Sequence, residues 1–112
     1  SDFARVVAEN ISVLLSTEQV DVYPWDADFN PRYQITFDIQ HFEGRQDQDV
    51  VLEVFWRIID PQNKEILRFE RSVIREPLTA GDYDTLIAAK SQAVEELSKI
   101  IVNEIKRFKK NV

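Results

Sequence analysis

Residues 49–59 of this chain read DVVLEVFWRII, a β-strand pattern from which the rest of the architecture follows. Successive side chains of a strand point to opposite faces of a sheet. One face of this stretch is therefore apolar throughout, whereas the other is mixed; the apolar face consists of Val50, Leu52, Val54, Trp56 and Ile58. A wholly apolar face has to be buried against another layer. We therefore expect a sheet that is covered on the side of Trp56.

Two further long strands are predicted beside this one. From Tyr33 to Gln40, apolar residues occupy the odd positions and polar residues the even positions, which is typical of a strand with one wet face. Polar stretches of hairpin length lie at 43–48 and 60–64, and a third run follows at 65–75. These patterns predict an antiparallel meander of three strands. A short fourth strand is expected at 20–23, where Pro24 ends it.

Helical patterns flank the strands at both ends of the chain. Residues 2–16 repeat apolar side chains every three or four positions, at Phe3, Val7, Ile11, Leu14 and Leu15. Asp82 can cap a second helix, whose apolar stripe comprises Tyr83, Leu86, Ile87, Ala93, Val94, Leu97, Ile100, Ile101, Ile105 and Phe108. The prediction is an α+β fold, with three antiparallel strands plus one short strand and two helices packed on one face of the sheet. At 112 residues the chain is expected to form a single domain, 1–112.

Composition excludes several classes of function. The chain has 14 Lys and Arg against 20 Asp and Glu, for a net charge of -6, so nucleic acid is not an expected partner. It contains no cysteine, which removes disulfides, thiol catalysis and cysteine-type zinc sites. Its apolar runs are far shorter than the roughly 20 residues needed to cross a bilayer. A soluble domain is expected.

The sequence offers no catalytic or metal-binding constellation. His41 is the single histidine, and it falls on the apolar odd-numbered face of its strand without a second ligand or base beside it. Residues 26–30 imitate the start of a calcium loop, but the sixth position is Pro31 instead of glycine and the twelfth is Phe37 instead of glutamate. We expect no enzyme activity, no cofactor and no metal.

Four aromatic residues stand in positions that the fold does not require. Tyr23 and Trp25 flank Pro24 in the loop after the short strand, and Phe42 and Phe55 fall on the wetter registers of their strands. Exposed aromatics mark interaction surfaces more often than catalytic sites. These four residues are therefore the candidate interaction surface. The alternative is that a second layer, or a segment outside this chain, covers them.

Five stretches of the sequence are informative in combination, namely SDFARVVAENISVLLST (1–17), VDVYPW (20–25), YQITFDIQHFEG (33–44), VVLEVFWRIID (50–60) and GDYD (81–84). Taken together, they resemble a known family, the ABC-type transport auxiliary lipoproteins of the PqiC and YmbA group. The resemblance implies an outer-membrane lipoprotein that faces the periplasm and serves a transport system with an MCE-domain protein, moving phospholipids between the two membranes. It implies no catalytic residues.

The resemblance also implies an architecture of which this chain is the C-terminal part. The family's lipid-bearing cysteine is not in the sequence, and strands that normally precede the first helix are expected to be missing. Attachment to a membrane is therefore expected only through an N-terminal lipid anchor outside this chain. The function that we expect is docking to MCE-domain or ABC transporter proteins, with homo-oligomers possible. The alternative is a lipid-carrying module that binds phospholipid acyl chains in its own interior.

Overall fold

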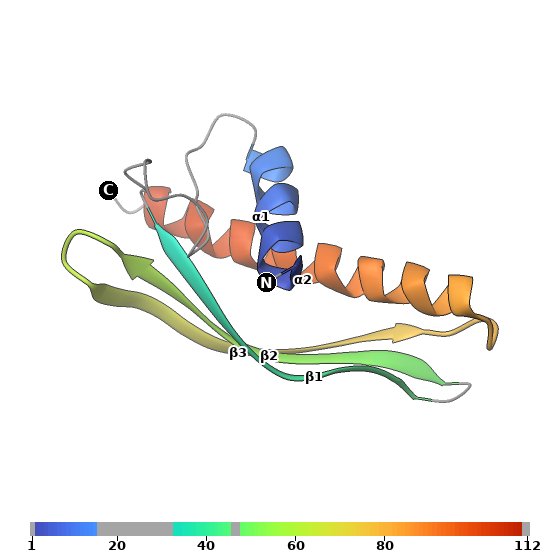
Figure 1. The fold of residues 1–112 in the computed structure, drawn as a ribbon. Helices are drawn as coiled ribbons and strands as arrows, with labels where there is room; N and C mark the ends of the chain where they lie inside the picture. The colour runs from blue at the N-terminus through green and yellow to red at the C-terminus, as the bar shows by residue number, and fades with distance from the viewer. Residues whose placement is uncertain (1, 16–32, 46–47, 111–112) are drawn as a thin grey trace.

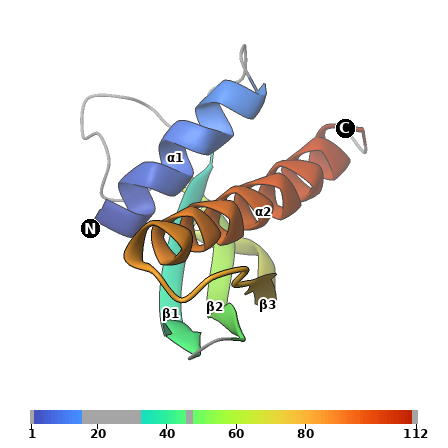
Figure 2. The same cartoon turned by 90° about the vertical axis from the view of Figure 1, so that its right-hand side faces the viewer.

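The computed structural model describes residues 2–15, 33–45 and 48–110. Helix α1 (Asp2–Leu15) is followed by three strands and a long helix, namely β1 (Gln34–Arg45), β2 (Asp49–Asp60), β3 (Glu65–Pro77) and α2 (Tyr83–Lys110). The strands form an antiparallel sheet in the order β1-β2-β3. Both helices lie on the same side of this sheet (Figures 1 and 2). The predicted α+β fold and the three-stranded meander are confirmed, whereas the short strand expected at 20–23 lies outside the described residues.

The apolar face of β2 forms the centre of the core. Its five side chains are all buried, from Val50 to Ile58, and Trp56 is the largest of them. They pack against the apolar stripes of the two helices, to which α1 contributes Val7 and Ile11. The matching residues of α2 are Ala93, Val94, Leu97, Ile101, Val102 and Ile105. Burial of this face explains why the sheet has helices on one side.

The stripe predicted for α2 is wider than the face that the helix buries. Tyr83 is 73% exposed, and Ile87 and Ile100 are also exposed. Their positions satisfy helical spacing, but the buried residues of α2 run from Ala89 to Ile105. Tyr83 and Ile87 therefore precede the covered part of the helix, whereas Ile100 lies within it on a more exposed face. The first turn of α2 therefore lies beyond the core, and Tyr83 is not the core residue that the periodicity indicated.

Polar side chains close the turns between these elements. The Arg45 guanidinium donates two hydrogen bonds to the Asp49 carboxylate, at 2.7 and 2.8 Å, across the β1–β2 hairpin. Asp60 accepts a 2.9 Å hydrogen bond from the backbone N–H of Gln62 in the β2–β3 turn. Asp82 caps α2 by accepting a 2.8 Å bond from the backbone N–H of Thr85. The cap predicted at Asp82 is therefore present.

Strand β1 differs from the prediction in length and in alternation. It continues through Arg45, so three residues expected in the turn belong to the strand. Its pairing with β2 also shifts between Ile39 and His41, which makes Gln40 the extra residue of a β-bulge. Gly44 lies where the start of α2 approaches the strand, and a Cβ there would meet the Leu86 Cδ1 atom at 2.6 Å. A Cβ at this position would displace the end of the flexible Leu86 side chain and meets no backbone atom of α2.

Candidate binding surfaces

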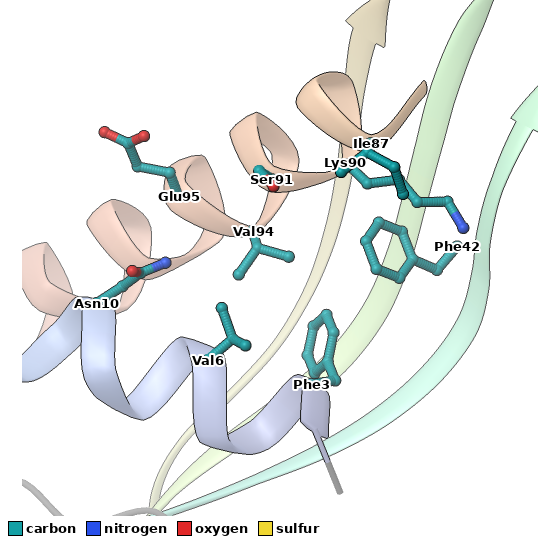
Figure 3. A pocket seen from close by; sticks show the side chains of 9 residues that line it. All are labelled: Phe3, Val6, Asn10, Phe42, Ile87, Lys90, Ser91, Val94 and Glu95. Atoms are coloured by element: carbon teal, nitrogen blue, oxygen red, sulfur yellow. The ribbon is translucent and has the colours of Figure 1, made fainter. Parts of the chain in front are cut away.

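An open groove of about 480 Å³ lies between α1, α2 and β1, and we call it the helix groove. Its apolar side chains come from all three elements and are Phe3, Val6, Phe42, Ile87 and Val94. Figure 3 shows Phe3, Val6, Phe42 and Val94 pointing toward one another across this space. Its polar side chains are Asn10, Lys90, Ser91 and Glu95. The groove is therefore an apolar surface with a polar border.

The bulge in β1 brings Phe42 into this groove. Phe42 pairs with Leu52, whose side chain is buried on the helix side of the sheet. The expected position of Phe42 on the wetter face was wrong, because Gln40 shifts the alternation of all later residues by one. Phe3 contacts Phe37 and Phe42 edge to face, with centroids 5.4 and 5.7 Å apart. Whether Phe42 takes part in an interaction stays a prediction.

Lys90 is the basic side chain of the helix groove. Its Nζ atom lies 4.9 Å from the centroid of the Phe42 ring, a distance at which a cation is attracted to the ring face. Among the described residues no carboxylate pairs with this ammonium group. Lys90 therefore provides a positive charge that the described part of the protein does not neutralise.

The opposite side of the sheet carries a second apolar surface, which we call the outer sheet face. Its apolar side chains come from β2 and β3 and are Val51, Phe55, Ile59, Ile66, Phe69 and Val73, and its charged or titratable side chains include Arg57, Arg71, Arg75, Glu53 and His41. The Phe55 and Phe69 rings are 5.8 Å apart, and the Arg57 guanidinium lies 4.9 Å from the Phe69 centroid. Phe55 thus lies on the wetter side, as expected, where it is half-buried beside Phe69, which is 55% exposed.

Two of the three arginines on the β2–β3 half of the outer sheet face pair with carboxylates, and the third does not. Arg71 binds the Glu53 carboxylate at 2.7 Å, and Arg75 lies 3.7 Å from Asp49. The hydrogen bond from Arg45 and the charges of Arg45 and Arg75 hold the pKa of Asp49 below its usual range. No carboxylate among the described residues pairs with Arg57. The β2–β3 half of the face therefore presents arginine beside exposed aromatic carbon.

His41 lies on the outer sheet face and not on the apolar face that simple alternation predicted. The bulge reverses its orientation and pairs it with Glu53 across the strands. Its Nδ1 atom is 3.2 Å from Glu43, and its Nε2 atom is 3.7 Å from Glu53. Within residues 2–15, 33–45 and 48–110, no cluster of His, Asp and Glu could hold a metal ion.

The other two candidate residues, Tyr23 and Trp25, lie outside the described residues. Sequence reasoning missed Phe69 and Lys90. The run containing Phe69, EILRFERSVIR, mixes apolar and charged side chains on both of its faces, so its exposed face was not evident from alternation. Lys90 gave no signal in the sequence, because its significance depends on Phe42, which is distant along the chain.

The described residues thus form an α+β domain with an apolar surface on each side of the sheet. A family model described as "ABC-type transport auxiliary lipoprotein component" matches residues 1–102, and the chain belongs to this family. The resemblance noted in the sequence is therefore confirmed. The family is not a known enzyme family, and its lipoprotein character indicates a location in the cell envelope. No curated protein matches the sequence.

Solved structures share this fold. A crystal structure of an uncharacterized protein matches 88% of this chain and 61% of its own, with a TM-score of 0.73 at 20% identity. A putative lipoprotein from Caulobacter crescentus matches 93% of this chain and 80% of its own, with a TM-score of 0.61 at 16% identity. PelC from Paraburkholderia phytofirmans, solved as a dodecamer, matches 82% of this chain and 67% of its own, with a TM-score of 0.59 at 15% identity. This chain thus spans about three fifths of the first of these structures.

None of the helices in the described part of the chain is both long enough and apolar enough to cross a bilayer.

Proposed function

We propose that this protein is a non-enzymatic component of an ABC and MCE-type transport system for phospholipids and that it acts by docking to a partner protein of that system. It works on the periplasmic side of the outer membrane, to which a lipid anchor outside this chain attaches the full-length protein. Membership in the family of transport auxiliary lipoproteins supports the transport role. The outer sheet face supports docking as its mechanism.

The observation that carries this proposal is the exposed pair of Phe69 and Arg57. Phe69 is 55% exposed, although it is a large apolar side chain on a regular strand. The Arg57 guanidinium lies beside its ring, at a distance at which a cation is attracted to the ring face. Aromatic and arginine side chains dominate the energetic centres of protein interfaces, and exposed apolar patches mark such interfaces.

Charge complementarity indicates which kind of partner surface fits the outer sheet face. On the β2–β3 half of the outer sheet face, Arg71 and Arg75 already pair with Glu53 and Asp49, whereas no carboxylate of the described residues pairs with Arg57. Val73 and Ile66 are also exposed there. A matching partner presents apolar side chains opposite Phe69 and a carboxylate opposite Arg57. The partner that we propose is the MCE-domain protein of the transport system, bound through an acidic and apolar patch.

The alternative of a carrier with lipid in its interior has less support. The side chains between sheet and helices are almost completely buried and pack against one another. A carrier needs room for chains inside, whereas a docking module needs a solid core and an external patch. The described residues fit the second description.

The docking proposal is tested by replacing Phe69 with serine and measuring binding to the purified MCE-domain protein. Phe69→Ser is expected to weaken binding about thirtyfold, because hot-spot truncations cost about 2 kcal/mol or more. Since Phe69 is largely exposed, its replacement should leave thermal unfolding nearly unchanged. Surface plasmon resonance gives the dissociation constants of the wild type and of Phe69→Ser for the MCE-domain protein.

Tyr83→Ser is the matched control, since Tyr83 is also an exposed aromatic residue but lies at the start of α2. It is expected to bind the partner as the wild type does. Equal binding by the wild type and Phe69→Ser would show that the outer sheet face is not the docking site. Tyr23 and Trp25 then become the next candidates, because their part in an interaction also remains a proposal.

Self-association is a further part of the proposal. The PelC structure, which shares the fold, is a dodecamer. This supports the proposal that the present chain also forms homo-oligomers.

A further inference from the structure

We propose that the helix groove is a binding site for one alkyl chain of an anionic amphiphile, with Lys90 binding its head group. This site is distinct from the outer sheet face, because the groove lies on the helix side of the sheet. The ligand class is a linear hydrocarbon chain that ends in a carboxylate or a phosphate ester.

The walls of the groove fit a hydrocarbon chain. Val6 is 37% exposed and Ile87 is 43% exposed, and both border the groove. Phe3 and Phe42, which also line the groove, lie edge to face. The volume of about 480 Å³ falls within the usual range for small-molecule sites, about 300–1,000 Å³. A bound chain would remove the exposed apolar carbon of Val6 and Ile87 from water.

The two ends of the helix groove carry opposite charges. Figure 3 shows Lys90 and Phe42 at one end of the groove and Asn10 and Glu95 at the other. The Lys90 ammonium has a ring contact and no carboxylate partner in the described residues. An anionic head group is therefore attracted to the Lys90 end and repelled from the Glu95 end. The net charge of -6 opposes this only weakly, because ionic screening at physiological salt acts beyond about 8 Å.

Titration of the purified chain with laurate, below its micelle concentration, tests the site. The fluorescent fatty acid cis-parinaric acid serves as the reporter that laurate displaces. We expect one bound laurate per chain, and amide NMR shifts confined to residues around Val6, Lys90 and Ser91. Absence of laurate binding, or shifts centred on Phe55 and Phe69, would overturn the proposal.

Val6→Glu places a carboxylate against the apolar wall and is expected to weaken laurate binding at least about tenfold. Its control is Ile100→Glu, since Ile100 is 38% exposed on α2 and does not line the groove. Circular dichroism verifies that both variants are folded. Equal losses in the two variants would overturn the assignment of the groove. If Val6→Glu does not fold, the NMR shifts of the wild type still test the site.

Lys90→Gln tests the head-group contact. It is expected to weaken laurate binding about fivefold, as for a partly exposed ion pair, and to leave binding of neutral dodecanol unchanged. Lys106→Gln removes an equal charge from α2 outside the groove and should have no effect. Unchanged laurate binding by Lys90→Gln would overturn the anionic head group.

Lysophosphatidylglycerol, tested in the same way, distinguishes the two sources of the head group. Binding that depends on Lys90 assigns a phosphate ester, and binding of laurate alone assigns a free carboxylate. Phe69→Ser is expected to bind laurate as the wild type does, so failure of the groove and failure of the docking proposal are separate results.

Discussion

Trp56 joins the sequence pattern most directly to the fold. It is 1% exposed, and its indole N–H donates a 2.9 Å hydrogen bond to the Ser72 hydroxyl on β3. The apolar face that predicted its burial continues without interruption through the strand, so no neighbouring feature could reverse the assignment. The polar partner was not predictable, because the register that places Ser72 beside β2 depends on the β2–β3 turn.

Trp56→Ala is expected to lower the free energy of unfolding by about 3–5 kcal/mol, because it leaves a cavity at the centre of the core. Trp56→Phe is the graded control and should cost less, since it retains most of the buried volume. Urea denaturation followed by far-ultraviolet circular dichroism measures both changes. A loss under about 1 kcal/mol for the alanine variant would contradict the burial of Trp56.

In helix α2, local sequence determines where the helix begins, whereas tertiary packing determines which of its side chains are buried. Its start at Asp82 was predictable, because capping depends on a short polar side chain before a helical pattern. Its exposed positions were not, because periodicity does not indicate how far the sheet extends beneath the helix. The helix groove was also beyond prediction, since it requires the spatial arrangement of α1, α2 and β1.

The cap of α2 predicts an acid dependence of stability. Hydrogen bonds from the Thr85 side chain and backbone lower the pKa of Asp82. The stabilisation is therefore fully present above the ordinary Asp pKa of about 3.9 and is lost as the pH falls through the lower pKa of the folded state. Asp82→Asn retains a capping oxygen but does not titrate. Thermal melts between neutral and acidic pH should show a smaller acid loss for Asp82→Asn than for the wild type.

The difference between these two proteins isolates Asp82, because Asp49, whose pKa is also lowered, is present in both. Asp82→Ala serves as the second comparison, and it should be less stable than the wild type at neutral pH. Parallel pH profiles for the wild type and Asp82→Asn would contradict a role for the Asp82 charge.

The sheet edges of the described residues bear on the proposed self-association. In the described residues, β1 and β3 each pair with a neighbour on one side only, and unpaired strand edges are sites of further strand pairing. Light scattering on the purified chain is expected to show masses that are multiples of 13.1 kDa and rise with concentration. A mass of one chain at the highest soluble concentration would contradict the proposed homo-oligomer.

The single extra residue of β1, Gln40, divides the strand into two parts with opposite alternation. Odd-numbered side chains face the helices before Gln40, and even-numbered side chains face them after it. Phe37 and Phe42 are separated by an odd number of positions, yet both contact Phe3, which a strand of strict period two does not permit. The part before Gln40 contributes Ile35 to the core, and the part after it contributes Phe42 to the helix groove. Comparison of this chain with its relatives therefore requires a gap at Gln40 wherever a relative lacks the bulge. Ungapped alignment would equate inward side chains with outward ones from His41 to Arg45.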